Sequence, residues 1–242
     1  KKARQSAPTV LFFDEIDAIA GARGTEVGTK VTERMVNQLL VEMDGLNELN
    51  QVIVLAATNR VDLIDPALLR PGRIDKIIYM PPPDKEGRKE IFKVHTKKLR
   101  VTDIDYDKLA EMTEGFTGAD IKMICEEVNR LVAKRAIKEK RVLKITTNDF
   151  IKVIKRISPS VTRAELEKYE RFKRMFERRT IKSVGESSEI VNMERVLAAV
   201  QEAYNKKLNM LLFGPEGNGK SFVVKQFAKK KGLKITILDC HD

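Results

Sequence analysis

The apolar residues of this sequence follow two patterns. Between Val31 and Met43 they recur at spacings of three and four, which indicates an amphipathic helix. Elsewhere they form short continuous runs with β-branched and aromatic members, typical of strands buried on both faces of a parallel sheet. A strand, a helix and a strand in succession predict a crossover unit of an α/β fold. The expected strands are 9–13, 52–57, 77–80, 210–213 and 235–238.

The middle of the chain is helical in pattern. Pro81-Pro82-Pro83-Asp84 stops regular structure, because proline removes a backbone donor and biases its neighbour to extended conformations. Helix periodicity then continues from 85 to about 156, with N-caps expected at Asp84, Thr117 and Thr147. A small helical bundle is therefore predicted.

The remainder of the chain returns to an α/β pattern. A charged helix is expected at 163–178, a polar linker at 181–188 and another helix at 190–204. We find no internal repeat, so the two α/β segments are complementary pieces and not copies. The predicted parts are an α/β segment, a helical bundle, a helix with a linker and a second α/β segment, at 1–84, 85–157, 158–188 and 189–242.

The strand at 210–213 is followed by a glycine-rich loop with the pattern G-x-x-x-x-G-K-S and then by a helix. In this context the pattern (Walker A) predicts a phosphate loop, because backbone N–H groups and the helix N-terminus point at the phosphates. Lys220 would neutralise the β and γ phosphates, and the Ser221 hydroxyl would ligate Mg²⁺. A glycine turn without a ligand is the alternative. The expected nucleotide-binding residues are Gly214, Pro215, Glu216, Gly217, Asn218, Gly219, Lys220, Ser221 and Phe222.

Two acidic residues follow the first apolar strand, as in a Walker B motif. Asp14 would contact Mg²⁺, and Glu15 would act as the general base that polarises the attacking water. The alternative is that the pair only caps the next helix.

The acidic strand precedes the phosphate loop, whereas a P-loop ATPase ordinarily has the two in the opposite order. The chain is therefore interpreted as a permuted domain, the middle of a tandem protein or an engineered recombination. If both segments fold together, we expect one sheet of order 5-1-4-3-2 with the strand at 210–213 in a central position. Permutation is tolerated where new ends lie at the surface.

Four further segments resemble one family: 11–17 (LFFDEID), 56–60 (AATNR), 65–75 (DPALLRPGRID) and 115–121 (GFTGADI). They are similar to the AAA ATPases, and over about 1–178 to the second ATPase domain of archaeal valosin-containing-protein-like unfoldases. The resemblance implies an α/β P-loop NTPase (AAA+) with a parallel sheet flanked by helices, and an all-α lid subdomain. It makes 1–84 part of the large subdomain and 85–157 the lid.

The resemblance also implies roles for single residues. Asn59 would be the sensor that orients the lytic water. Arg70 and Arg73 match arginine fingers, which reach the nucleotide of a neighbouring subunit. The alternatives are a turn asparagine and surface ion pairs.

Lid residues would approach the adenine or ribose, namely His95 and the Gly118-Ala119 backbone. A structural histidine and a helix-entry turn are the alternatives. The sequence departs from the family at Glu216 and Asn218, where Pro and Thr are usual. In the family, a helix and an aromatic pore loop connect the strand that corresponds to 235–238 with the segment that corresponds to the residues before Pro8. We expect both to be missing from this chain.

These features predict Mg-ATP binding and hydrolysis in a ring-forming ATPase that remodels or unfolds proteins as a chaperone does. The chain is expected to self-associate, as a hexamer by resemblance, and to act on protein substrates or adaptors in an archaeal cytoplasm. One alternative is an assembly or regulatory module with incomplete nucleotide sites. Another is a nucleic-acid-binding P-loop ATPase.

Composition restricts these classes. The charge of +11 comes from 46 Lys and Arg against 35 Asp and Glu, spread over helices without interleaved aromatic residues, so nucleic acid is an unlikely partner. No apolar run reaches the roughly 18 to 20 residues of a membrane span. Cys125 and Cys240 are read as free thiols in a reducing compartment. No metal site is expected from Asp239 to Asp242.

Overall fold

The structure is a computed structural model that describes residues 9–19, 30–44, 52–177 and 193–240. Its contacts divide the chain into two compact units. The first contains residues 1–80, 167–214 and 219–242, and the second contains 81–166 and 215–218. The polar linker expected at 181–188 lies outside the described residues.

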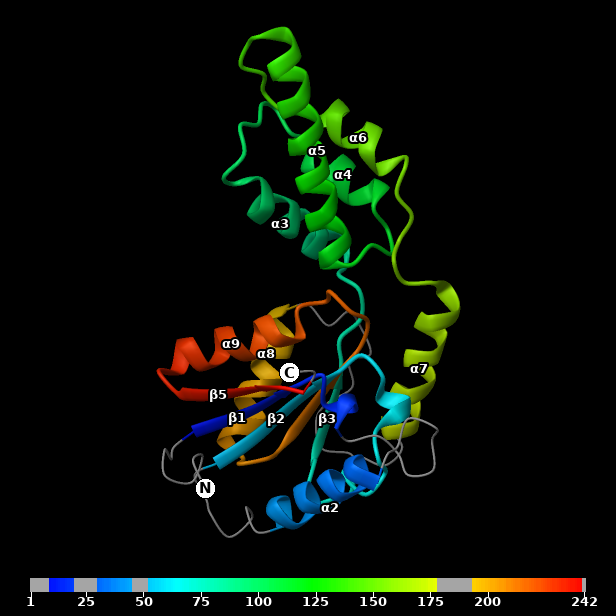
Figure 1. Ribbon diagram of the computed structural model, residues 1–242, viewed down its shortest axis with the longest axis vertical. Helices are drawn as coiled ribbons and strands as arrows, with labels where there is room; N and C mark the ends of the chain where they lie inside the picture. Colours follow the sequence, from blue (N-terminus) through cyan, green and yellow to red (C-terminus); the bar gives the residue numbers. More distant parts are fainter. Residues whose placement is uncertain (1–8, 20–29, 45–51, 178–192, 241–242) are drawn as a thin grey trace. The chain divides into compact units, whose positions relative to one another are not determined.

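The first unit is built on a parallel sheet of five strands (Figure 1). Their order is β3-β4-β2-β1-β5, and every neighbouring pair is parallel. Counted from the strand before the phosphate loop, this is the predicted order 5-1-4-3-2. The strands are β1 (Thr9–Asp14), β2 (Val52–Thr58), β3 (Lys76–Tyr79), β4 (Met210–Phe213) and β5 (Lys234–Asp239).

Strand β4 comes from the far end of the sequence and lies between two strands of the first segment. Phe213 is in register with Thr58 of β2 on one side and with Tyr79 of β3 on the other. Strand β1 pairs with β2 and β5, so β2 alone separates it from β4 in the sheet. Because all strands are parallel, β1, β2 and β4 end at the same edge of the sheet.

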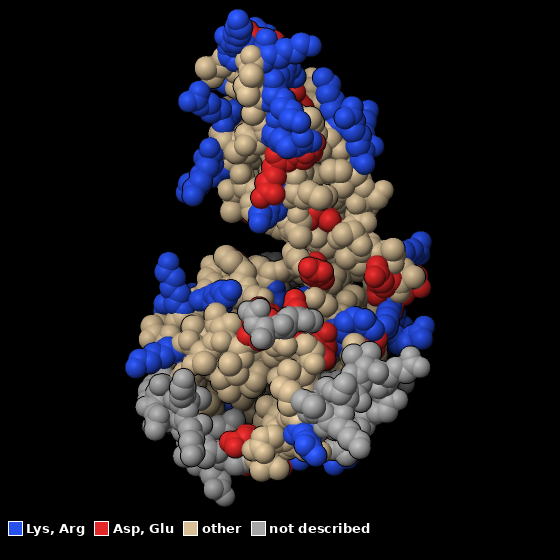
Figure 2. All heavy atoms as spheres, in the orientation of Figure 1, with Lys and Arg blue, Asp and Glu red and all other residues tan. Residues whose placement is uncertain are grey.

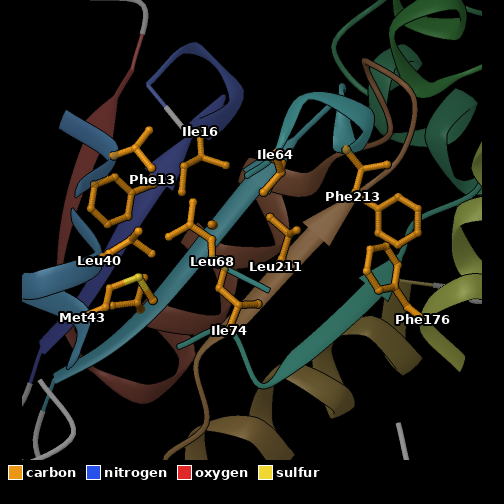
Figure 3. Packing of buried hydrophobic residues seen from close by; sticks show 14 of the residues in the cluster. Phe13, Ile16, Leu40, Met43, Ile64, Leu68, Ile74, Phe176, Leu211 and Phe213 are labelled. Carbon is orange, nitrogen blue, oxygen red and sulfur yellow. The ribbon is translucent and has the colours of Figure 1, made fainter. Parts of the chain in front are cut away.

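Alternate residues of the central strands enter two separate cores, as the two-residue period of a strand requires. One face carries Phe13 and Phe213 and packs against α2 (Lys30–Asp44) and the end of α7 (Arg163–Glu177), as Figure 3 shows. The other face carries Phe12 and Leu212. It packs against α8 (Met193–Asn205) and α9 (Lys220–Lys231).

Asn209 joins the start of β4 to both neighbouring segments. Its Oδ1 accepts from the buried Val54 N–H at 2.9 Å, and its Nδ2 donates to the Arg73 carbonyl at 2.7 Å. The backbone N–H groups of Asp75 and Lys76 donate to the Asn209 carbonyl at 3.0 and 3.1 Å. One side chain thereby continues the β2–β4 ladder by one further bond.

The second unit is helical and contains α3 (Lys85–Thr96), α4 (Tyr106–Met112), α5 (Gly118–Glu139) and α6 (Thr147–Ile154). The expected N-caps are found at Asp84, which accepts from Gly87 N–H, and at Thr117, which forms a capping box with Asp120. The N-cap expected at Thr147 is wrong by one residue. Thr146 has extended backbone angles and forms the capping box, because Asp149 lies three residues after it.

The described part of the chain contains no helix that is long and apolar enough to cross a membrane. Both cysteines are free thiols, as predicted. Cys125 lies in the core of the second unit, where burial raises its pKa to about 12.

We expect Asn209→Ala to lower the free energy of unfolding by about 2 kcal/mol, since it leaves the buried Val54 N–H without an acceptor. Urea denaturation of the purified chain measures this. Asn205→Ala is the matched control, because Asn205 is exposed and accepts only from Gln201 on its own helix. Equal effects of the two substitutions would contradict the role given to Asn209.

Candidate nucleotide-binding and hydrolysis site

The two predicted halves of the site meet at the carboxyl edge of the sheet. The Ser221 hydroxyl donates to Asp14 Oδ2 at 2.6 Å, across 207 residues of sequence. Lys220 is buried, and its ammonium group donates to the Gly214 carbonyl at 2.9 Å across the phosphate loop. The sheet places these groups, because Asp14 ends β1 and the loop directly follows β4.

The phosphate loop has a backbone that glycine makes possible. Gly214, Gly217 and Gly219 all have positive φ angles. A Cβ at Gly214 would lie 2.2 Å from the Met80 carbonyl oxygen, so a side chain is excluded there. Glu216 and Phe222 are exposed, whereas Pro215 and Asn218 are buried. The Glu216 carboxylate therefore lies where water solvates it.

The oxygen atoms at this edge suit Mg²⁺. A hydroxyl and a carboxylate 2.6 Å apart can share one octahedral cation, whose adjacent ligand oxygens are about 2.9 Å apart. Among the described residues no group of three His, Cys, Asp or Glu side chains could hold a metal. In a nucleotide complex, Ser221 and Asp14 would hold Mg²⁺ together with phosphate oxygens, which is how Mg²⁺ usually binds in nucleotide sites.

Negative charge gathers around the end of β1. Burial and, after it, the charges of Asp239, Asp14, Asp17 and Glu15 together raise the pKa of Cys240 to about 11. A cation bound at this edge would be stabilised by the same carboxylates.

Glu15 has a left-handed backbone, with φ of 53° and ψ of 46°. A non-glycine residue in this region costs on the order of 1–3 kcal/mol, and such strain often occurs at functional sites. Glu15 is the N-cap residue of the 3₁₀ helix η1 (Ile16–Ala18), yet its side chain makes no capping hydrogen bond. The alternative that Glu15 only caps this helix is therefore not supported.

Asn59 directly follows β2 at the same edge, and three residues that sequence reasoning gave no role surround it. The Thr58 hydroxyl donates to Asp17 at 2.6 Å and accepts from the Arg60 N–H at 2.9 Å. The Tyr169 hydroxyl on α7 donates to the Asn59 carbonyl at 2.6 Å. Asp17 lies within a quoted motif, but no sequence pattern relates Tyr169 to a loop 110 residues away.

Two further contacts hold α7 beside this loop. Lys168 pairs with Asp62 at 2.9 Å. Burial raises the pKa of Asp62, but hydrogen bonds from Lys168 and Arg60 outweigh it and leave the pKa below its usual value. The Tyr169 ring stacks on Tyr79, with centroids 6.0 Å apart, and Tyr79 contacts Phe213 at 5.2 Å. Helix α7 therefore contacts both the Asn59 loop and the end of β4.

The two predicted arginine fingers differ in their surroundings. The Arg73 guanidinium donates to both carboxylate oxygens of Asp44 at 2.8 and 2.9 Å, and to the Ala67 carbonyl at 2.9 Å. Arg70 is exposed, and its side chain has no bonded partner among the described residues. The surface ion pair that was the alternative for both residues is found for Arg73 alone.

The remaining predicted residues lie in the second unit. The tip of the phosphate loop contacts the start of α5: a Cβ on Gly217 would lie 2.4 Å from the Ala119 Cβ, and one on Gly118 would lie 2.8 Å from the Gly217 carbonyl oxygen. His95 is half-buried on α3, where burial, and then the charge of Lys122, lower its pKa. No described contact joins His95 to the loop.

The parallel sheet, the glycine loop between β4 and α9, and the acidic end of β1 define an α/β P-loop nucleoside triphosphatase. Residues 1–82 match the AAA family, ATPases associated with various cellular activities, and residues 103–168 match the AAA+ lid domain. The chain belongs to the AAA ATPases. The predicted fold and family are confirmed.

Three similar proteins, all from archaea, illustrate the relationship. The chain is 49% identical over 189 residues to the cell division cycle protein 48 homolog of Archaeoglobus fulgidus, covering 74% of this chain and 26% of the relative. It is 46% identical over 204 residues to protein SAV of Sulfolobus acidocaldarius, with the same coverage of 74% and 26%. A proteasome-activating nucleotidase of Methanopyrus kandleri is 49% identical over 158 residues, 64% of this chain and 35% of the relative. The chain spans about a quarter of the length of the first two.

We expect Tyr169→Phe to destabilise the chain by about 1 kcal/mol, because the Asn59 carbonyl loses its donor. Tyr204→Phe removes a hydroxyl without a hydrogen-bonded partner among the described residues, and should change stability by less than about 0.5 kcal/mol. Chemical denaturation compares the two. A larger loss for Tyr204→Phe would refute the assignment.

Proposed function

We propose that this chain binds Mg-ATP at Asp14, Lys220 and Ser221 and hydrolyses it in a ring of AAA subunits that remodels proteins. The observation that carries the proposal is the 2.6 Å hydrogen bond from Ser221 to Asp14, since it joins both halves of one site within one sheet. It favours a complete site over an assembly module with separated halves.

In the proposed reaction each residue has one task. Lys220 and the loop N–H groups hold the phosphates. Asp14 and Ser221 would hold Mg²⁺, which would neutralise phosphate charge when bound. Glu15 takes a proton from the attacking water, and the Asn59 amide orients that water. By the family resemblance, His95 and the Gly118-Ala119 backbone would contact the nucleoside.

Arg70 is the better candidate for an arginine finger. It is exposed, and its guanidinium is available to the nucleotide of a neighbouring subunit. Arg73 is bound to Asp44 and the Ala67 carbonyl, which makes it a positioning residue for the loop that carries Arg70. Hydrolysis then requires contact between subunits, for which a hexamer is proposed from the family resemblance. Protein substrates and adaptors are likewise proposals about the whole protein.

Lys220→Ala should weaken Mg-ATP binding by about 10- to 100-fold, through loss of charge-assisted contacts to phosphate. Asp14→Asn should weaken binding only when Mg²⁺ is present. Isothermal titration calorimetry with and without Mg²⁺ measures both, and Lys225→Ala, an exposed lysine of α9, is the control. If Asp14→Asn has no effect while Lys220→Ala abolishes binding, the two halves act separately and the assembly-module alternative is favoured.

Glu15→Gln and Arg70→Ala should each reduce turnover by about 10²-fold or more while nucleotide binding persists. Mixing the two inactive variants should restore part of the activity, because an Arg70 from a Glu15→Gln subunit can complete the site of an Arg70→Ala neighbour. Phosphate release from pre-mixed chains measures this.

A mixture of Glu15→Gln and Lys220→Ala is the control for that experiment. Both of these residues act within one subunit, so no activity should return. If the first mixture also stays inactive, Arg70 does not act across an interface.

A further inference from the structure

The second unit carries a cavity between α5 and α6 that has no part in the nucleotide site. Its volume is about 150 Å³, room for on the order of five water molecules at 30 Å³ each. Buried Val128, Val132 and Val153 form its apolar floor. Leu131 lies on its wall with 36% of its surface exposed, unlike the valines beneath it.

Three cations line the rim of this cavity: Arg135, Lys152 and Arg156. The one carboxylate among the lining residues, Asp149, is already engaged. It accepts from the Thr146 N–H and hydroxyl at 2.9 and 2.8 Å as part of the capping box, and from Arg135 at 3.1 Å. It cannot neutralise all three cations.

Lys152 and Arg156 have no side-chain hydrogen bond or ion pair within the part of the chain that the structure describes. The opposite end of the unit is different. There Lys85 pairs with Glu111 at 2.6 Å, Lys89 with Asp107 at 2.7 Å and Lys93 with Glu90 at 2.6 Å. Among the described residues of this unit, Lys97, Lys98 and Arg100 also lack an ion pair, but they do not line the cavity. Unpaired cations beside an apolar floor are therefore the feature of the α5–α6 cavity.

The surrounding sequence strengthens this charge. Residues 118–156, which include both helices, contain 11 Lys and Arg against five Asp and Glu, a formal net charge of +6 within a chain of net charge +11. Figure 2 shows Lys and Arg gathered over the end of the unit where α5 finishes. Such a field attracts acidic partners and is screened by salt.

We propose that the α5–α6 cavity, defined by its valine floor, Leu131 and its three cationic rim residues, is a docking site for an acidic protein segment with an aliphatic anchor. The aliphatic side chain would fill the floor beside Leu131, and flanking carboxylates would pair with Lys152 and Arg156. Protein interfaces commonly place apolar anchors in a central pocket and polar groups at the rim.

Two other occupants fit less well. Nucleic acid would use the cations but leave the apolar floor unfilled, and no aromatic side chain lines the cavity for base stacking. A second copy of the same face would place like charges opposite each other, which is unfavourable.

The test uses the full chain and a labelled peptide of Asp and Glu with two Leu at its centre. Fluorescence anisotropy should show saturable binding that Lys152→Glu with Arg156→Glu weakens by about tenfold or more. The matched control is Lys138→Glu with Lys144→Glu, which makes the same change of charge at exposed positions outside the cavity. It should change the dissociation constant by no more than about twofold to threefold.

Two more probes separate the apolar contribution to binding from the electrostatic one. A peptide with Ser in place of Leu, and a Leu131→Ser chain, should each bind more weakly at constant charge, because the apolar contact is lost. Thermal melting confirms that each variant is folded. The proposal is overturned if both double variants weaken binding equally, if oligothymidylate binds more tightly than the peptide, or if the cavity variant changes the oligomeric state and not peptide binding.

Discussion

The parallel pairing of β4 with β2 and β3 is the constraint on which the rest of this molecule depends. Strand β4 lies between β3 and β2 in the sheet and supplies buried residues to both faces of the sheet. It also brings the phosphate loop to the edge where β1 and β2 end. The pairing of β5 with β1 joins the same two segments a second time, and together the two pairings bring Ser221 to Asp14.

The nucleotide site follows from that pairing with few additional contacts. The hydroxyl of Ser221 reaches Asp14, Asp17 holds Thr58 beside Asn59, and Tyr169 supports the Asn59 carbonyl. Each contact spans a long stretch of sequence. The site therefore forms only when the sheet and α7 are assembled. The charged α5–α6 face depends only on local helix packing in the second unit.

Much of this could be predicted from the sequence. Apolar runs located the strands, and the glycine loop required its strand and helix. Positions determined by long-range contacts could not be predicted: no local pattern distinguishes Arg70 from Arg73, because the Asp44 partner of Arg73 lies 29 residues away. The sequence offers two adjacent threonines as the N-cap of α6. Thr146 is the N-cap, and not the predicted Thr147, because Thr146 forms the capping box with Asp149.

The position of β4 between β3 and β2 also has a consequence for the order of folding. During synthesis, β1, β2, β3 and the helices of the second unit are made before residues 210–213. Until then β2 and β3 each present an edge of unpaired backbone groups, an arrangement prone to wrong association. The helical unit has mainly local contacts and can form early, whereas closure of the sheet must wait for a pairing of high contact order. Closure of the sheet is therefore expected to be the slow step in the folding of this chain.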